Sequence, residues 1–495
     1  MVNAHRAIGR TVLKTVLLAW LKRPFAAFLR DVQGWWALVR AKSALRPGLS
    51  TYYLRPPGGT RRVHLRIDFD GAGVLIVDAT DAIHVNPSAA LIAKFALDGR
   101  PRDQVVSTLK CRFSGVKKSE VQRHIDRMYA LVHHLSTTTD ACHTCGLDAI
   151  RSPLFSTPVA APYKADLALT YGCNNACRHC YNRLEPLERP KDKHNRAGEL
   201  SVQKWKDVLR KLADIGVPHV IFTGGEPTLF PGLCDLIRRA EHLGLITGLN
   251  TNGRRLADRA FVDSLVHAGL SHVQITLESY RLDVHNAMTV ADSFDETCRG
   301  ITNAITAGLH VITNTTLTRQ NVDHALETVD FINRLGINTF AMNGMIFSGR
   351  GLHNNDAVAV EKLTSVLAAV RDRAKALGMR FLWYTPTDYC RLSPMELELG
   401  PRRCNAGEYS MCIEPNGDVL PCQSYYVVAG NILRDPWQRI WESDLFRSFR
   451  DRVRDPQACG LPEHCWQCPD LPLCGGGCRL ERAARDEGQG TRNVA

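Results

Sequence analysis

The placement of cysteines is the feature that most constrains this chain. Twelve of its seventeen cysteines fall in two groups, three at residues 173–180 and nine at residues 390–478. An exported disulfide scaffold is disfavoured, because no long apolar region with a small-residue cleavage site marks a secretory signal. Grouped cysteines of this kind are typical of thiolate metal ligands in a reducing compartment, so we expect a cytoplasmic protein.

The first group lies on one short loop, Cys173-Asn-Asn-Ala-Cys177-Arg-His-Cys180, directly after a β-rich run at 166–170. Three thiolates can hold three irons of a [4Fe-4S] cubane and leave the fourth iron free for a ligand. A zinc site would need four ligands, usually in pairs. The spacing therefore favours an open iron-sulfur cluster.

The loop, with three and then two intervening residues, is similar to the signature of radical S-adenosylmethionine (SAM) enzymes. Thr223-Gly224-Gly225-Glu226-Pro227 resembles that family's glycine-rich motif, which binds the methionyl amino group of SAM. Glycines let backbone carbonyls approach a ligand, and Glu226 can accept a hydrogen bond from an ammonium. The resemblance implies that the reduced cluster cleaves SAM to a 5'-deoxyadenosyl radical, which abstracts hydrogen from a substrate.

Polar residues at later strand ends are implied as further contacts to the ribose and carboxylate of SAM. The alternative is that they merely cap strand ends. No general acid or base can be assigned from the sequence. The full set of candidate cofactor-binding residues is Gly224, Gly225, Glu226, Pro227, Thr276, Glu278, Ser279 and Asn314.

The second cysteine group resembles the SPASM extension of radical SAM enzymes, which holds auxiliary iron-sulfur clusters. The resemblance implies one [4Fe-4S] cluster shared by Cys404, Cys422 and Cys478, and another shared by Cys465, Cys468 and Cys474. A zinc ribbon is the alternative.

SPASM members usually supply a further cysteine after this run, and residues 479–495 contain none. We expect Cys390 to complete the first cluster and Cys459 the second. If either is not a ligand, a water, an Asp such as Asp486, or an open iron takes its place. Cys412 is interpreted as a core residue. Cys142 and Cys145 are interpreted as a reduced thiol pair, with metal binding together with other ligands as the alternative.

Residues 166–346 alternate short β-rich runs with helical stretches, the pattern of parallel α/β units. Six units are too few for an eight-stranded barrel, so we predict an α/β fold with a partial (β/α)6 TIM-type barrel. The predicted strands are 166–170, 219–223, 245–250, 272–277, 310–316 and 339–345.

A smaller domain is predicted before the barrel. β-rich runs at 63–69 and 73–79 flank Asp70-Gly71, and Asn86-Pro87 opens the first of about three helices, as in a winged-helix-like domain. The domain resembles the PqqD-like element, which implies that an exposed sheet edge takes a leader peptide as an added strand. The alternative is a plain winged helix that packs on the barrel or binds nucleic acid, although the sequence offers no aromatic stacking platform for the latter.

The net charge of +12 could favour an acidic protein partner, a nucleic acid or an anionic membrane, and by itself it does not distinguish among them. The basic amphipathic N-terminal region either packs on its own protein, makes peripheral membrane contact or has a targeting role. Residues 46–62 are interpreted as a linker, and residues from 484 onward as disordered. The predicted domains are the basic amphipathic helical region at 1–45, the PqqD-like winged-helix domain at 60–136, a connector at 137–164, the radical SAM core barrel at 165–384, the SPASM domain at 385–480 and a tail at 481–495.

The favoured hypothesis is an enzyme that matures a ribosomally synthesised peptide or protein and takes electrons from a reductant such as flavodoxin or ferredoxin. No nucleic-acid partner is expected. Two alternatives stay open: modification of a small molecule such as a haem-pathway tetrapyrrole, and a non-catalytic iron-sulfur electron carrier. Neighbouring genes for a short peptide or for haem synthesis would separate the two enzymatic hypotheses.

Overall fold

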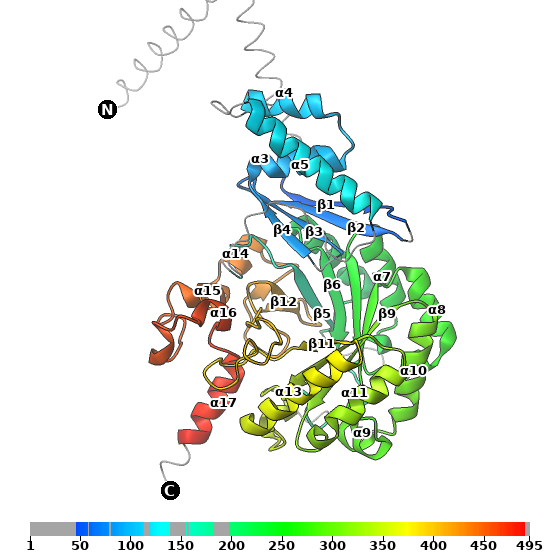
Figure 1. Ribbon diagram of the computed structural model, residues 1–495. Helices are drawn as coiled ribbons and strands as arrows, with labels where there is room; N and C mark the ends of the chain where they lie inside the picture. The colour runs from blue at the N-terminus through cyan, green and yellow to red at the C-terminus, as the bar shows by residue number, and fades with distance from the viewer. Residues whose placement is uncertain are drawn as a thin grey trace, which may run out of the picture. The chain divides into compact units, whose positions relative to one another are not determined.

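The computed structural model (Figure 1) divides the chain into two compact units, Met1–Ala149 and Ile150–Ala495. It describes residues 46–57, 59–78, 81–112, 118–138, 155, 158–182 and 198–490. The predicted helical region at 1–45 and the Cys142 and Cys145 pair lie outside these ranges.

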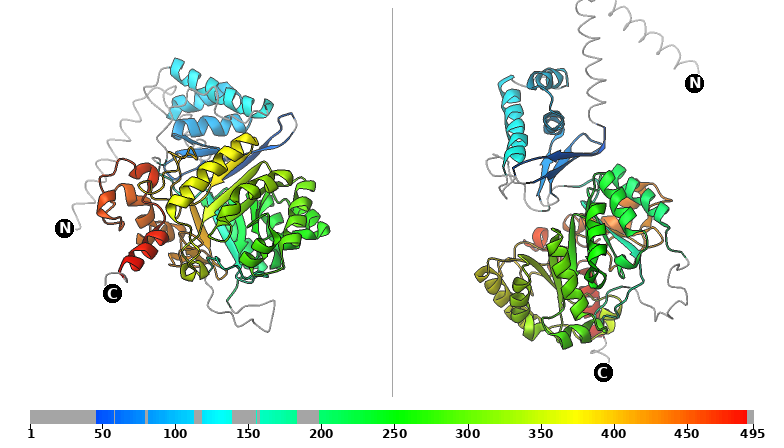
Figure 2. Two further views of the ribbon diagram at one scale, coloured as in Figure 1. Left: turned by 60° about the horizontal axis from the view of Figure 1, so that its bottom comes forward. Right: turned by 90° about the vertical axis from the view of Figure 1, so that its right-hand side faces the viewer.

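The first unit is a four-stranded antiparallel sheet followed by three helices. The sheet order is β1-β2-β3-β4, and the helices lie together on one of its faces (Figure 2). Alternate residues of β2, such as Val63 and Leu65, pack in one core with Leu91, Ile125 and Leu135. The elements are β1 (Gly48–Leu54), β2 (Arg61–Ile67), β3 (Gly73–Val77), β4 (Asp81–Val85), α3 (Pro87–Leu97), α4 (Arg102–Arg112) and α5 (Lys118–Thr137).

The predicted linker at 46–62 is wrong over its first half, because Gly48–Leu54 forms strand β1. This strand pairs with the whole of β2, from Gly48 opposite Ile67 to Leu54 opposite Arg61. Its sequence, Gly-Leu-Ser-Thr-Tyr-Tyr-Leu, contains one β-branched residue and two tyrosines in succession, residue types that favour strands. The breaker residues Pro56, Pro57 and Gly59 lie beyond the strand.

The second unit contains the predicted parallel strands, which are confirmed as β5 to β10. A seventh parallel strand, β11, was missed because it has just four residues. Helices α7, α8, α10, α11 and α13 lie outside the curved sheet (Figure 1). In chain order the elements are β5 (Lys164–Thr170), α6 (Val202–Ile215), β6 (His219–Gly224), η1 (Pro227–Leu229), α7 (Leu233–His242), β7 (Ile246–Thr251), η2 (Arg254–Ala257), α8 (Arg259–Ala268), β8 (His272–Thr276), α9 (Leu282–Thr289), α10 (Phe294–Thr306), β9 (His310–Leu317), η3 (Val322–His324), α11 (Ala325–Arg334), β10 (Thr339–Gly344), α12 (Arg350–His353), α13 (Val360–Ala376) and β11 (Arg380–Trp383).

The cysteine-rich region continues the same sheet. Strand β12 runs parallel to β5, with Cys412 opposite Asp166, and β13 and β14 follow as antiparallel neighbours. The complete order is β11-β10-β9-β8-β7-β6-β5-β12-β13-β14. The remaining elements are β12 (Ser410–Ile413), β13 (Asp418–Leu420), β14 (Gly430–Asn431), α14 (Trp437–Trp441), α15 (Asp444–Arg450), η4 (Asp451–Val453), η5 (Glu463–Cys465), α16 (Leu471–Cys474) and α17 (Arg479–Gly490).

Helix α17 contradicts the expectation that residues from 484 onward are disordered, because it continues to Gly490. Arg485 on this helix forms an ion pair with Glu481 at 3.2 Å and a second one with Asp388. The first pair lies within the helix, and the second binds the helix to the segment that follows β11.

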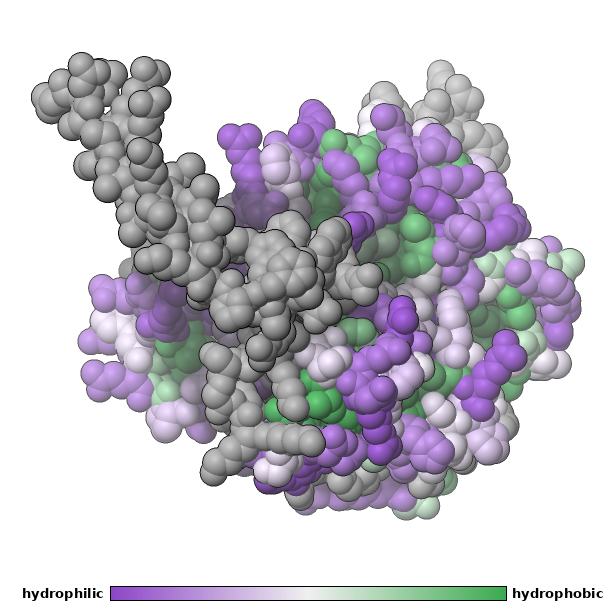
Figure 3. Space-filling view, turned by 90° about the horizontal axis from the view of Figure 1, so that it is seen from above, coloured by the Kyte–Doolittle hydropathy of each residue, from purple (hydrophilic) through white to green (hydrophobic). Residues whose placement is uncertain are grey.

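Hydrophilic side chains dominate the described surface in Figure 3, and apolar residues form small separate patches. This is the usual surface of a globular protein, in which single exposed apolar side chains such as Phe69 and Trp466 are common. Among the described residues, no helix is both long and apolar enough to cross a membrane.

Gly300 tests how tightly helix α10 packs on the turn before η2. A Cβ atom at Gly300 would lie 2.2 Å from the carbonyl oxygen of Gly253. Overpacking costs about 1–3 kcal/mol, more than the ~1 kcal/mol by which Ala exceeds Gly in helix propensity. We expect Gly300→Ala to lower the thermal midpoint measured by circular dichroism. Thr302→Ala on the exposed side of the same helix should leave it unchanged or raise it, and an equal rise in both variants would contradict the packing.

Candidate active site

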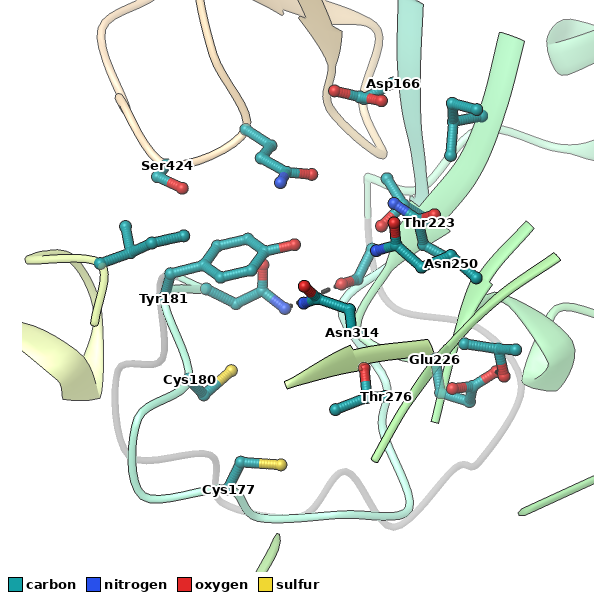
Figure 4. Close-up of a pocket in the computed structure, with 18 of the residues that line it drawn as sticks. Asp166, Cys177, Cys180, Tyr181, Thr223, Glu226, Asn250, Thr276, Asn314 and Ser424 are labelled. Atoms are coloured by element: carbon teal, nitrogen blue, oxygen red, sulfur yellow. Dashed lines mark hydrogen bonds between the residues drawn. The ribbon is translucent and has the colours of Figure 1, made fainter. Parts of the chain in front are cut away.

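The carboxyl ends of the barrel strands open into a cavity of about 1890 Å³. Cys173, Cys177 and Cys180 line it, together with Thr276 and Asn314 from the ends of β8 and β9. Figure 4 shows the sulfur atoms of Cys177 and Cys180 on the same side of the cavity as Thr276 and Asn314. The loop cysteines and the strand-end residues therefore face one space.

Backbone contacts with the end of α9 fix the cysteine loop. The Ala176 amide donates to the Thr289 carbonyl and the Arg178 amide to the Met288 carbonyl, both at 3.0 Å. On the other side, Arg254 Nη1 donates to the Asn174 carbonyl at 2.6 Å. The loop is therefore held between α9 and the turn after β7.

The environment of the three thiols suits metal-bound thiolates. Burial raises the pKa of Cys173 to about 12 and also raises the pKa values of Cys177 and Cys180. The Asn175 amide donates to Cys173 Sγ at 3.4 Å. Buried thiols of this kind ionise when a cation binds them, and the irons of a cluster supply that charge.

The glycine motif shapes the cysteine loop as well as the cavity. A Cβ atom would lie 2.3 Å from the Thr170 carbonyl oxygen at Gly224, and 2.4 Å from the Gly172 carbonyl oxygen at Gly225. The Gly225 amide donates to the Thr170 carbonyl at 2.7 Å, and Asn182 Nδ2 donates to the Gly224 carbonyl at 2.8 Å. These two glycines let the end of β6 approach the backbone on which the cysteine loop begins.

Glu226 lies at the cavity, but its carboxylate is engaged by the protein. Oε1 accepts hydrogen bonds from the hydroxyls of Thr228 and Thr251, each at 2.7 Å, and Oε2 accepts from the Asn252 amide at 2.8 Å. Burial raises the pKa of this carboxyl group. Glu226 thus connects the ends of β6 and β7.

Glu278 is fully buried and is engaged in a similar way. Its Oε1 atom lies 2.9 Å from His179 Nε2, and its Oε2 atom accepts a hydrogen bond from the Thr316 amide at 2.8 Å. His179 stands between two of the loop cysteines, so this pair connects the loop to β8 and β9. The sequence alone did not indicate this role for His179, although the residue lies within the cysteine motif.

The remaining candidate cofactor contacts divide into two sets. Thr276 and Asn314 line the cavity, whereas Pro227 and Ser279 do not. Asn314 Nδ2 donates to Asn343 Oδ1 at 2.8 Å, and its own buried Oδ1 has no hydrogen-bond partner. This oxygen is a ready acceptor for a ligand hydroxyl. Ser279 instead accepts from the Arg281 amide at 3.1 Å.

The Gly349-Arg350-Gly351 segment after β10 was not singled out from the sequence. Arg350 Nε donates to the Cys177 carbonyl at 2.9 Å, and the Gly351 amide donates to the Cys180 carbonyl at 3.3 Å. A Cβ at Gly349 would lie 2.2 Å from the Asn182 carbonyl oxygen. The sequence signal that could have predicted this contact is the pair of glycines on either side of Arg350, directly after a strand.

The cavity continues along the barrel interior to the starts of the strands, where Lys164, His219 and His272 line it. The His219 and His272 rings lie 5.0 Å apart. Burial lowers the pKa of His272 to about 4, so this imidazole is neutral at pH 7. These residues were not predicted from the sequence, because no recognisable motif marks the starts of the strands.

Cys404, Cys422 and Cys478 line the same cavity as the loop cysteines. Burial and the neighbouring Cys404 and Cys478 raise the pKa of Cys422 to about 12, and burial and Cys404 raise the pKa of Cys478 to about 11. These three cysteines are therefore neighbours. Cys412 is buried against Ala168 and Leu420, in agreement with a core role.

Cys465 and Cys474 are not among the residues that line this cavity. They lie near each other, because Cys474, after burial, raises the pKa of Cys465. Within the described ranges, no three His, Cys, Asp or Glu side chains converge closely enough to hold a single metal ion. A cubane is wider than one ion and takes each thiolate on a different iron. The buried thiols, the close-approach glycines and the unpaired Asn314 oxygen fit a cluster with a ligand beside it.

The fold and the site define an iron-sulfur protein built on an α/β barrel. Residues 167–332 match the model of the radical SAM superfamily, and residues 404–469 match that of the SPASM iron-sulfur cluster-binding domain. Similar proteins include the PqqA peptide cyclase of Streptomyces rochei, 30% identical over 65% of this chain and 86% of that protein. The mycofactocin maturase MftC of Mycobacterium tuberculosis is 30% identical over 66% of this chain and 80% of that protein.

The crystal structure of Streptococcus suis SuiB has a similar fold, with a TM-score of 0.60 and 17% identity over 85% of this chain and 95% of that one. The matched 85% of this chain is longer than the second unit, Ile150–Ala495, so the similarity in fold extends into the first unit. The chain belongs to the radical SAM superfamily. The presence of a radical SAM domain and a SPASM domain is thereby confirmed, and the protein is an enzyme whose cofactors are a [4Fe-4S] cluster with SAM and auxiliary iron-sulfur clusters.

Arg350 provides a test of the geometry around the cysteine loop. Its positive charge acts on all three loop cysteines, so Arg350→Gln should make the loop cluster harder to reduce, by on the order of 50 mV. The measurement is a redox titration followed by electron paramagnetic resonance. Arg319→Gln is the control, because Arg319 Nε also donates to a backbone carbonyl, that of Ala357, at 3.1 Å. An unchanged potential in the Arg350 variant would contradict this role.

Proposed function

We propose that this enzyme matures a ribosomally synthesised peptide or protein by radical chemistry. The observation that carries the proposal is a cavity onto which both the loop cysteines and three auxiliary-cluster cysteines open. Its volume of about 1890 Å³ exceeds the ~300–1000 Å³ typical of a small-molecule pocket. The space suits a cofactor together with part of a chain-like substrate.

The relatives support a peptide substrate. One is named a PqqA peptide cyclase and another a mycofactocin maturase, and SuiB has been crystallised with its precursor peptide SuiA. A haem-pathway tetrapyrrole remains the competing substrate class, and it serves as a separate arm of the experiment below.

When bound, the cluster and SAM supply a one-electron cleavage that yields methionine and a 5'-deoxyadenosyl radical. The chain's own residues hold and shield this chemistry. Cys173, Cys177 and Cys180 would hold three irons, and Asn314 Oδ1 would accept a hydrogen bond from SAM. The protein walls of the cavity would keep water from the reacting atoms.

The first unit is proposed to be a PqqD-like, winged-helix-like domain that recognises a leader peptide. Its sheet ends in two edge strands, β1 and β4, and an edge strand offers unpaired backbone groups to an added strand. We further propose a cytoplasmic enzyme that takes electrons from a flavodoxin or ferredoxin, because cleavage of SAM requires a reduced cluster.

Cleavage of SAM is tested directly in the anaerobic, iron-reconstituted enzyme. With dithionite and SAM, we expect 5'-deoxyadenosine and methionine by liquid chromatography. Cys177→Ala should abolish both products and lower the iron content by about four per chain, because the loop cluster is lost. Cys234→Ala on helix α7 should retain activity, since its thiol lies 3.5 Å from the Ser264 hydroxyl and away from the cavity. Unchanged 5'-deoxyadenosine in the Cys177 variant would contradict this assignment.

Peptide recognition is tested by hydrogen exchange. A peptide encoded beside the gene should slow backbone amide exchange in one edge strand, 48–54 or 81–85, because an added strand pairs those amides. A scrambled peptide is the control. If no adjacent peptide binds and a tetrapyrrole instead increases 5'-deoxyadenosine formation, the enzyme acts on a small molecule.

A further inference from the structure

The segment before Cys390 lies directly against the second group of auxiliary-cluster cysteines. The Tyr389 amide donates to Cys474 Sγ at 3.4 Å, and Cys474 Sγ lies 3.7 Å from the Thr387 carbonyl oxygen. Cys390 is the next residue and is exposed.

Further contacts hold this segment in place. Asp388 forms an ion pair with Arg485 of α17, and Arg391 forms one with Glu481 at 3.3 Å. A Cβ atom at Gly477 would overlap the Asp388 carboxylate, so the segment and the glycines after Cys474 are in close contact. Cys390 therefore belongs on the side of Cys465 and Cys474.

Cys459 has a different environment from the other candidate ligands. Its thiol is buried near Asp451, Asp455, Arg452 and Arg479, and Arg479 Nη2 donates to its carbonyl at 3.4 Å. These are the contacts of a structural cysteine within an ion-pair network.

The first auxiliary group faces the cavity. Within the described range 198–490, the cysteines that line this cavity are Cys404, Cys422 and Cys478. Arg452 Nη2 donates to the Cys404 carbonyl at 2.5 Å and to Glu408 at 2.9 Å, and Arg403 also bonds Glu408. This buried network fixes one corner of the group while its thiols stay at the cavity wall.

We propose that Cys390 is the fourth ligand of the cluster held by Cys465, Cys468 and Cys474. The cluster held by Cys404, Cys422 and Cys478 then has three thiolates and one iron open to the cavity. This reverses the assignment expected from the sequence, in which Cys390 completed the first cluster and Cys459 the second.

The open iron binds an anionic donor of the substrate, such as a thiolate or carboxylate. The donor replaces a water molecule, and no electron is transferred in this exchange. Arg402 lines the same cavity and favours an anion there. Lys164 also lines it, but its ammonium is paired with Asp166 at 3.1 Å. The ligand assignment goes beyond the proposed function and holds for a peptide or a small-molecule substrate.

The test uses the full chain with Cys173, Cys177 and Cys180 all changed to alanine, which leaves the auxiliary clusters alone. After anaerobic reconstitution and reduction, ¹³C-cyanide is the probe, and electron-nuclear double resonance detects its coupling to iron. We expect one cyanide-binding cluster per chain. Adding Cys390→Ala should double the cyanide-binding clusters or lower the iron content by about one per chain, whereas adding Cys459→Ala should change neither value.

Two results would overturn the proposal. If cyanide shows no coupling to iron in the starting variant, no auxiliary cluster has an open iron. If iron is lost in the Cys459 variant but not in the Cys390 variant, Cys459 and not Cys390 is the fourth ligand. Cys390→Ser keeps a donor oxygen in place, so it separates a changed ligand from a misfolded chain: native circular dichroism with a shifted cluster spectrum supports ligation, and an unshifted spectrum contradicts it. None of these readings depends on peptide binding, so a failure of the proposed function is recognised separately.

Discussion

The close approach of two strand ends is the constraint on which the site depends. The end of β5, at Thr170 and Gly172, meets the turn after β6 at Gly224 and Gly225, where a Cβ atom would overlap backbone oxygens. The cysteine loop begins at this contact and is fixed at its far end by Asn182 and Arg350. A loop that brings three cysteines to one cavity must be held in place by the protein, because thiolates close together repel one another when no metal is bound.

Buried carboxylates stabilise this arrangement from within. Glu226 connects the ends of β6 and β7 through Thr251 and Asn252, and Glu278 connects β8 and β9 to His179 of the cysteine loop. Both oxygens of Glu226 accept hydrogen bonds, whereas Glu278 accepts one at Oε2 and has His179 Nε2 beside Oε1 at 2.9 Å. In the protein alone these residues position the site, and Asn314 Oδ1 is one of the buried acceptors at the cavity that have no hydrogen-bond partner.

The pairing of β12 with β5 places the auxiliary cysteines at the catalytic cavity. Because Cys412 lies opposite Asp166 in this pairing, the hairpin that follows carries Cys422 to the cavity wall. Cys404 and Cys478 reach the same wall from other segments. The SPASM region is thus an extension of the barrel sheet, which explains why two groups of cysteines far apart in sequence share one space.

The sequence by itself determined the cofactor class, the six barrel strands and the three helices of the first unit, because spacing motifs and hydrophobic periodicity are local properties. It did not determine β1, because the prolines and glycines around this strand are typical of a linker. Nor did it determine β11 or the length of α17, since short or polar elements become stable through strand pairing and ion pairs with distant residues. Nor did it show that the carboxylates of Glu226 and Glu278 accept hydrogen bonds from other residues of the protein, or that the segment before Cys390 lies beside Cys474. Those relations join residues 25 to 85 positions apart, and only the tertiary fold brings such residues together.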